Sequence, residues 1–128
     1  MYAIRSYYGT TYLANRRKTA AIWVRDPRIS ILGSGSGPDH AWVRTREATY
    51  VSVYLSPNCT ARDYKAKVEA IEDAIRDLGV NVIVAGDFTA RAMEWGMPLT
   101  NSRRCLLLEM AARLDLEVAK RRECANLP

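Results

Sequence analysis

The chain has 128 residues and a formal net charge of +5, with 48% hydrophobic and 26% charged residues. This composition is typical of a globular domain, and no apolar run approaches the ~20 residues that a membrane-spanning helix needs. Because the N-terminus also lacks the apolar stretch of a signal peptide, we expect an intracellular protein, nuclear or cytoplasmic, without a membrane partner.

The first forty residues give weak signals. Residues 1–17 contain four tyrosines without a sustained period of 2 or 3.6, so no element is predicted there. A short strand is predicted over residues 20–24. The glycines and serines of residues 33–38 predict a flexible hairpin loop, because they lack the spacing and the terminal Lys-Ser/Thr of a phosphate-binding loop. We expect His40, the lone histidine, to be solvated beside this loop.

Two strands follow, over residues 41–46 and 49–55. In the second, Val51, Val53 and Leu55 alternate with Tyr50, Ser52 and Tyr54, which is the period of a strand. Few residues separate the two strands, so they are expected to form an antiparallel pair.

The clearest predicted helix covers residues 61–78. Thr60 is a natural N-cap, Asp63 stands at the capping-box position, and Gly79 supplies a C-terminal stop. Apolar residues recur at steps of three and four, which predicts one buried face. This face consists of Tyr64, Val68, Ile71, Ile75 and Leu78.

The run over residues 80–85, apolar apart from Asn81, predicts a strand covered on both faces. A polar loop over 87–101 and a helix over 102–114 follow, and residues 116–118 are expected to begin another strand. The predicted buried stripe of that helix consists of Leu107, Met110, Ala111 and Leu114. Asp87 follows the apolar run directly; a carboxylate there either caps a turn or faces a site, and the pattern alone leaves both readings open.

Positive charge gathers at residues 16–18, 103–104 and 120–122. Such clusters suit a polyanionic partner, but a solvated surface explains them equally well. The cysteines are odd in number and widely spaced, which predicts reduced thiols rather than a zinc site or a disulfide framework. They are Cys59, Cys105 and Cys124.

Three motifs occur in order: Y-L-S-P-N at 54–58, V-A-G-D-F at 84–88 and E-W-G at 94–96, with the helix between the first two. Together they resemble the endonuclease/exonuclease/phosphatase family, and within it the apurinic-endonuclease-like domain of non-LTR retrotransposons. The resemblance implies an α/β fold, a four-layered α/β sandwich of which this chain holds the central portion. We expect residues 18–128 to form this partial domain and residues 1–17 to be unassigned and foreign to it.

The resemblance implies phosphodiester hydrolysis with Mg²⁺ or Mn²⁺ by a DNA endonuclease that nicks DNA, with a reverse transcriptase domain in the same polyprotein. Asp87 matches the acid that orients or deprotonates the attacking water, and Tyr54 matches a tyrosine that contacts the scissile phosphate. Asn58 matches an amide that holds the phosphate, although without the family an Asx turn explains it. Thr89 stands where the family has asparagine, whose amide reaches further.

Other family residues have no match in this chain. These are an early asparagine, a metal-binding glutamate and a final Asp-His pair, so the sequence identifies no metal ligand. The family glycine is replaced by Arg104. We therefore expect weak or absent activity from residues 1–128 alone. The alternative function is a catalytically inactive fragment that binds nucleic acid through its basic clusters.

Overall fold

A computed structural model describes residues 2–5, 11–56, 59–88 and 99–117 of the chain. They form seven strands and two helices: β1 (Tyr2–Arg5), β2 (Thr11–Ala14), β3 (Ala21–Val24), β4 (Gly33–Gly37), β5 (His40–Arg44), β6 (Thr49–Tyr54), α1 (Ala61–Leu78), β7 (Val82–Asp87) and α2 (Leu99–Arg113). None of the helices in these ranges is long and apolar enough to cross a membrane.

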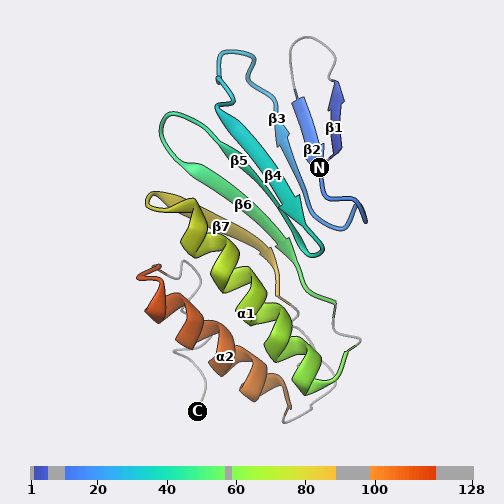
Figure 1. Ribbon diagram of the computed structural model, residues 1–128, viewed down its shortest axis with the longest axis vertical. Coiled ribbons are helices and arrows are strands. Elements are labelled where there is room, and N and C mark those ends of the chain that lie inside the picture. The colour runs from blue at the N-terminus through green and yellow to red at the C-terminus, as the bar shows by residue number, and fades with distance from the viewer. Residues whose placement is uncertain (1, 6–10, 57–58, 89–98, 118–128) are drawn as a thin grey trace.

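The elements form three layers, shown in Figure 1. One layer is an antiparallel sheet of order β1-β2-β3, called here sheet A. The second, sheet B, has the order β4-β5-β6-β7; its first three strands are antiparallel, and β7 joins β6 in parallel. Helices α1 and α2 cover the face of sheet B that points away from sheet A.

The main core lies between sheet B and the two helices. Val51, Val53 and Leu55 point from β6 and its end toward α1, while the residues between them point to the other face. From α1, the buried residues of the predicted apolar face meet them, and α2 adds Met110. The predicted helix 61–78, its Thr60 cap and the β5–β6 pairing are all confirmed.

A second, smaller core lies between the two sheets. Ala41 and Val43 of β5 are fully buried on the face opposite α1. Leu13 of β2 is 2% exposed and, together with its neighbour Ala14, lies in the sheet that packs against β5. The middle of sheet B is therefore buried on both faces.

The N-terminal segment departs from expectation, since residues 1–17 contain two strands where none was predicted. β2 pairs with β3 from Thr11↔Val24 to Ala14↔Ala21, and β1 pairs with β2 on its other side. The boundary expected near residue 18 thus falls in a turn between two hydrogen-bonded strands. Hydrogen bonds to neighbouring strands hold these residues in strands, although their sequence has no strand periodicity.

The predicted flexible loop at residues 33–38 is also wrong, because Gly33–Gly37 is strand β4, paired with β5. The indole of Trp42 lies against Gly35 so closely that a Cβ there would stand 2.5 Å from its Nε1. Glycine is required by this contact with the neighbouring strand rather than by a turn.

His40 is not solvated, since it lies on β5 with 9% of its surface exposed. Burial lowers its pKa, while the nearby charge of Asp39 acts in the opposite direction. Burial therefore favours the neutral form of this imidazole.

The outer face of β7 is open, contrary to the prediction of a strand covered on both faces. Val82 and Val84 pack against the helix-side core, but Ile83 is 51% exposed. Sheet A packs on β5 and reaches β6, and β7 lies beyond β6 at the edge of sheet B. The strand expected from residue 116 does not form over Leu116 and Glu117, and Val118 lies outside the described residues.

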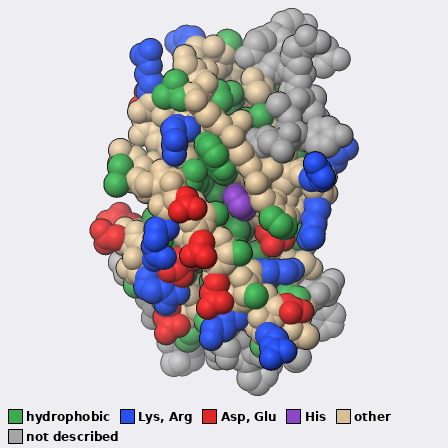
Figure 2. All heavy atoms as spheres, in the orientation of Figure 1, with side chains coloured by type: hydrophobic (Ala, Val, Ile, Leu, Met, Phe, Trp, Pro, Cys, Tyr) green, Lys and Arg blue, Asp and Glu red, His purple; other side chains and the backbone are tan. Residues whose placement is uncertain are grey.

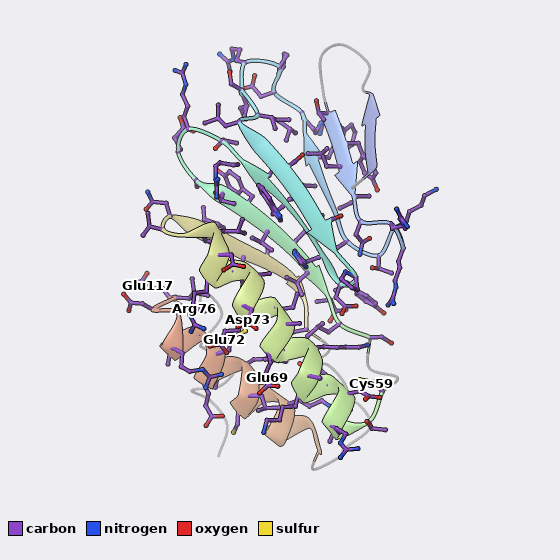
Figure 3. The ribbon with its side chains drawn as sticks, in the orientation of Figure 1. Cys59, Glu69, Glu72, Asp73, Arg76 and Glu117 are labelled. Atoms are coloured by element: carbon purple, nitrogen blue, oxygen red, sulfur yellow. The ribbon has the colours of Figure 1, made fainter. Side chains whose placement is uncertain are left out.

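A buried acid joins the two helices. Glu72 of α1 accepts hydrogen bonds from Arg113 of α2, at 2.7 Å from Nη2 and 3.0 Å from Nε, and from Arg76 at 2.9 Å. Figure 3 shows Glu72 and Arg76 on α1 beside α2. The hydrogen bonds from Arg113, followed by those from Arg76, lower the pKa of Glu72 from 4.5 to about 2 against the opposing effect of burial.

Replacing Ile71 with alanine should lower the free energy of unfolding by ~2–5 kcal/mol, because Ile71 lies in the main core with 3% of its surface exposed. Urea denaturation measures the loss. Asp77→Ala, at an exposed position of the same helix, should change stability by less than ~0.5 kcal/mol. Equal effects of the two substitutions would contradict the packing described above.

The Glu72 ion pairs predict a specific acid sensitivity. The pKa of Glu72 is lower in the folded state, about 2, than its ordinary value of 4.5, so its contribution to stability is complete above pH 4.5. That contribution is lost as the pH falls from about 4.5 to 2. Urea denaturation across this range should show the parent losing stability faster than Glu72→Gln. Parallel pH curves for the two proteins would exclude the pairing as the source of acid sensitivity.

Candidate active site

Tyr54 and Asp87 lie side by side at one edge of sheet B. They are register partners at the carboxyl ends of the parallel strands β6 and β7, where adjacent backbones run ~4.8 Å apart. Just past Tyr54, the Leu55 amide donates a hydrogen bond of 2.9 Å to the carbonyl of Asp87. The structure therefore brings these two predicted site residues together.

Both side chains belong to the face of sheet B that points away from α1. Val53 and Val84 point toward the helices, and the alternation of a strand places Tyr54 and Asp87 on the opposite face. Asp87 is exposed and Tyr54 is half-buried.

Gly86 shapes the end of β7 just before the acid. Its φ of 151° is a conformation that residues with a side chain rarely adopt. A Cβ at this position would collide with the backbone of Val53, its register partner on β6. The glycine before Asp87 is therefore needed for the close approach of the two strands that carry the site.

Helix α1 holds the chain immediately after Asp87. Tyr64 is fully buried, and its hydroxyl donates a hydrogen bond of 2.6 Å to the carbonyl of Phe88. The guanidinium of Arg103 lies 4.6 Å from the centre of the Tyr64 ring, and its Nη2 donates to the carbonyl of Cys59 at 2.8 Å. The two helices thereby fix the backbone on both sides of the site.

The Arg103 contacts correct the prediction of a basic surface at residues 103–104. Arg103 has only 4% of its surface exposed and is used inside the fold. The sequence gives no signal for this, because a planar cation stacked on a buried tyrosine has the same sequence pattern as a surface arginine. The side chain of Arg104 lies outside the described residues.

Several predicted residues cannot be placed. Asn58 and Thr89 lie outside the described residues, and their roles stay predictions. Cys59 and Cys105 are free thiols, while Cys124 also lies outside the described part.

The chemistry of the placed residues suits a phosphate ester. A carboxylate accepts a proton and is a hard oxygen ligand, and a phenol donates a hydrogen bond to a phosphoryl oxygen. Within the described ranges, no group of three or more His, Cys, Asp or Glu side chains is arranged to hold a metal ion. The Asp87 carboxylate is a hard oxygen ligand of the kind that magnesium accepts.

One contact at this edge was missed by the sequence patterns. The carbonyl of Asp39, in the turn between β4 and β5, accepts a hydrogen bond of 2.9 Å from the amide of Tyr54. Since residues 33–38 were predicted to be a loop, nothing placed this turn beside the end of β6.

A mixed sheet covered by helices, with an acid and a tyrosine at its carboxyl edge, is the arrangement expected for the endonuclease/exonuclease/phosphatase fold. A family model described as endonuclease-reverse transcriptase matches residues 48–126, and the chain belongs to this family. The match extends from the start of β6 through α2, so it contains both Tyr54 and Asp87.

The fold is similar to the solved endonuclease domain of TRAS1, a telomere-specific non-LTR retrotransposon, with a TM-score of 0.56 and 25% sequence identity. The similarity covers 84% of this chain and 54% of that one, so the chain spans about half the length of its structural relative. A search of curated proteins gives no match. The predicted family and its α/β fold are confirmed.

Removing the hydroxyl of Tyr64 tests the support of the site. Tyr64→Phe should lower the free energy of unfolding by about 1 kcal/mol, the usual contribution of one hydrogen bond, because the ring and its stacking are kept. Amide hydrogen exchange at Leu55 should become faster. Tyr50→Phe is the control, since Tyr50 is 37% exposed on β6 and should change neither quantity. Unchanged exchange in Tyr64→Phe would show that the hydroxyl does not hold this edge.

Proposed function

We propose that this chain is part of a DNA endonuclease domain that hydrolyses phosphodiesters with Mg²⁺ or Mn²⁺ and nicks DNA. The observation that carries the proposal is the register pairing of Tyr54 with Asp87 at the carboxyl edge of sheet B, within the region that the family model matches. The similarity to a retrotransposon endonuclease domain supports a parent polyprotein that also contains a reverse transcriptase. The protein would meet its DNA substrate in the nucleus or the cytoplasm.

Each residue has a role in this proposal. The exposed carboxylate of Asp87 orients the attacking water and accepts its proton. The Tyr54 hydroxyl donates to a phosphoryl oxygen as negative charge develops there. Asn58 holds the phosphate or the adjoining backbone, and Thr89 contributes a single hydroxyl where a longer amide would reach further.

A magnesium ion would supply charge neutralisation at the phosphate. Asp87 is the described residue that would hold it, and water and substrate phosphate oxygens commonly complete the coordination of Mg²⁺ in such sites. The residues of the chain contribute orientation and proton transfer.

The second candidate is a chain that binds nucleic acid without cleaving it. Its support is the net charge of +5 together with the exposed basic residues 16–18. Cleavage and binding are separable by experiment, because only cleavage depends on Asp87.

Nicking of supercoiled plasmid tests the proposal. In the full product of its reading frame, Asp87→Ala should abolish Mg²⁺-dependent nicking, and Tyr54→Phe should slow it by ~10²-fold, the effect of losing one positioned donor. Asp77→Ala, an exposed acid on α1, is the matched control and should keep the parent rate.

Residues 1–128 alone should nick no faster than their own Asp87→Ala variant, because the parts of an active site act as a unit and some family residues have no match here. Nicking by the full product that survives Asp87→Ala would overturn the site assignment. Nicking by residues 1–128 that is lost in the variant would show that this portion suffices for catalysis.

A further inference from the structure

The turn between β2 and β3 carries the basic cluster 16–18. Arg16, Arg17 and Lys18 are all exposed there. Of the three clusters seen in the sequence, this one is described and on the surface, since Arg103 is buried and residues 120–122 lie outside the described part.

A buried amide holds this turn in place. Asn15 is 0% exposed, and its Oδ1 accepts hydrogen bonds from the amides of Thr19 at 2.9 Å and Ala20 at 3.2 Å. Its Nδ2 donates to the hydroxyl of Thr19 and to the carbonyl of Pro38, both at 3.0 Å. The last bond ties the basic turn to the β4–β5 turn of sheet B.

That second turn links the basic cluster to the site. The carbonyl of Asp39 accepts a hydrogen bond of 2.9 Å from the amide of Tyr54. The carboxylate of Asp39 lies 3.9 Å from Nη1 of Arg17. Figure 1 shows the β2–β3 and β4–β5 turns together on the right of the molecule. In Figure 2, Lys and Arg side chains are visible on this side of the molecule and on the opposite side.

Other charged surfaces of the described residues are less suited to binding a polyanion. The groove between α1 and α2 is lined by more acidic than basic side chains, among them Glu69, Asp73 and Glu109. Arg25 and Arg46 are exposed, but they follow the ends of β3 and β5 that lie opposite the two turns. The described basic turn is thus the cluster that the fold carries to the end of the sheet where Tyr54 and Asp87 lie.

We propose that Arg16 and Arg17 bind the phosphate backbone of a DNA duplex that lies across Tyr54 and Asp87; this rests on the proposed function. Exposed guanidinium groups bind phosphate oxygens through two parallel hydrogen bonds. The ion pair of Arg17 with Asp39 is long, at 3.9 Å, and the Arg17 side chain is 63% exposed. The pair therefore contributes little to stability, and a phosphate can replace Asp39 as the partner of Arg17. The Asn15 bonds keep the turn ordered before DNA arrives, which reduces the entropy lost on binding.

The test compares two variants that each remove two positive charges. Arg16→Gln with Arg17→Gln changes the proposed contact, and Arg25→Gln with Arg46→Gln is the matched control at the opposite end. Affinity for a short labelled duplex is measured by fluorescence anisotropy over a range of salt, with EDTA present so that cleavage plays no part. Thermal melts of each protein show whether it remains folded.

Loss of two phosphate contacts should reduce the slope of log K against log salt by about 1.8, since each contact contributes about 0.9, and should weaken binding at low salt by at least ~10-fold. The control should keep a slope close to the parent. A third variant, Arg16→Lys with Arg17→Lys, should keep the parent's salt slope because it retains both charges. Its affinity should still fall, because lysine cannot form the two parallel hydrogen bonds of a guanidinium. Equal losses in both glutamine variants, or a loss in neither, would overturn the proposal.

The outcome is separable from that of the nuclease proposal. If the turn binds DNA but Asp87→Ala leaves nicking by the full product intact, the site assignment fails and the binding surface stands. If Asp87→Ala abolishes nicking while the two glutamine variants bind alike, the site stands and the binding surface fails.

Discussion

The parallel pairing of β6 with β7 is the constraint on which the site depends. Two parallel strands cannot be joined by a tight turn, so the chain must cross back over the sheet between them. Helix α1 does this with 18 residues, or ~27 Å at 1.5 Å per residue, which exceeds the ~20 Å length of a six-residue strand. Its apolar face then has to cover β6 and β7, and that cover holds Tyr54 and Asp87 in register at one edge.

Buried polar side chains of the two helices fix the positions of particular backbone groups beside the sheet. Apolar packing between valine and isoleucine side chains is non-directional, so it does not by itself fix the position of the backbone at Phe88. The Tyr64 hydroxyl and the Arg103 guanidinium supply that direction, because each reaches a particular backbone carbonyl, that of Phe88 or that of Cys59. Buried polar groups are costly unless they are paired, so their placement beside the site points to positioning more than to bulk stability.

The sequence could predict those parts of the fold in which each element carries its own signal. Helix α1 has a cap, a stop and a periodic face, and β6 alternates cleanly, so both appear where they were expected, and Asp87 is found at the end of β7. The failures have a common physical cause: their environment comes from a neighbouring strand. Gly33–Gly37 is a strand because Trp42 packs on it, His40 is buried by the layers around β5, and Ile83 is exposed because β7 forms an edge. Asp87 and Tyr54 lie at one edge of sheet B, and their catalytic roles stay predictions.

The turn at Pro38 and Asp39 connects the basic turn of sheet A with the end of β6 in sheet B. The carbonyl of Pro38 accepts a hydrogen bond from the side-chain amide of Asn15, which holds the basic turn of sheet A. The carbonyl of Asp39 accepts a hydrogen bond from the backbone amide of Tyr54 in sheet B. Because both links use backbone carbonyls, they depend on the path of the β4–β5 hairpin more than on the identity of either side chain. The pairing of glycine-rich β4 with β5 therefore fixes the position of the turn that contacts sheet A. It sets the position of exposed positive charge relative to Tyr54 and Asp87, so that the proposed binding of a polyanion and the proposed chemistry of its phosphates would share one end of the molecule.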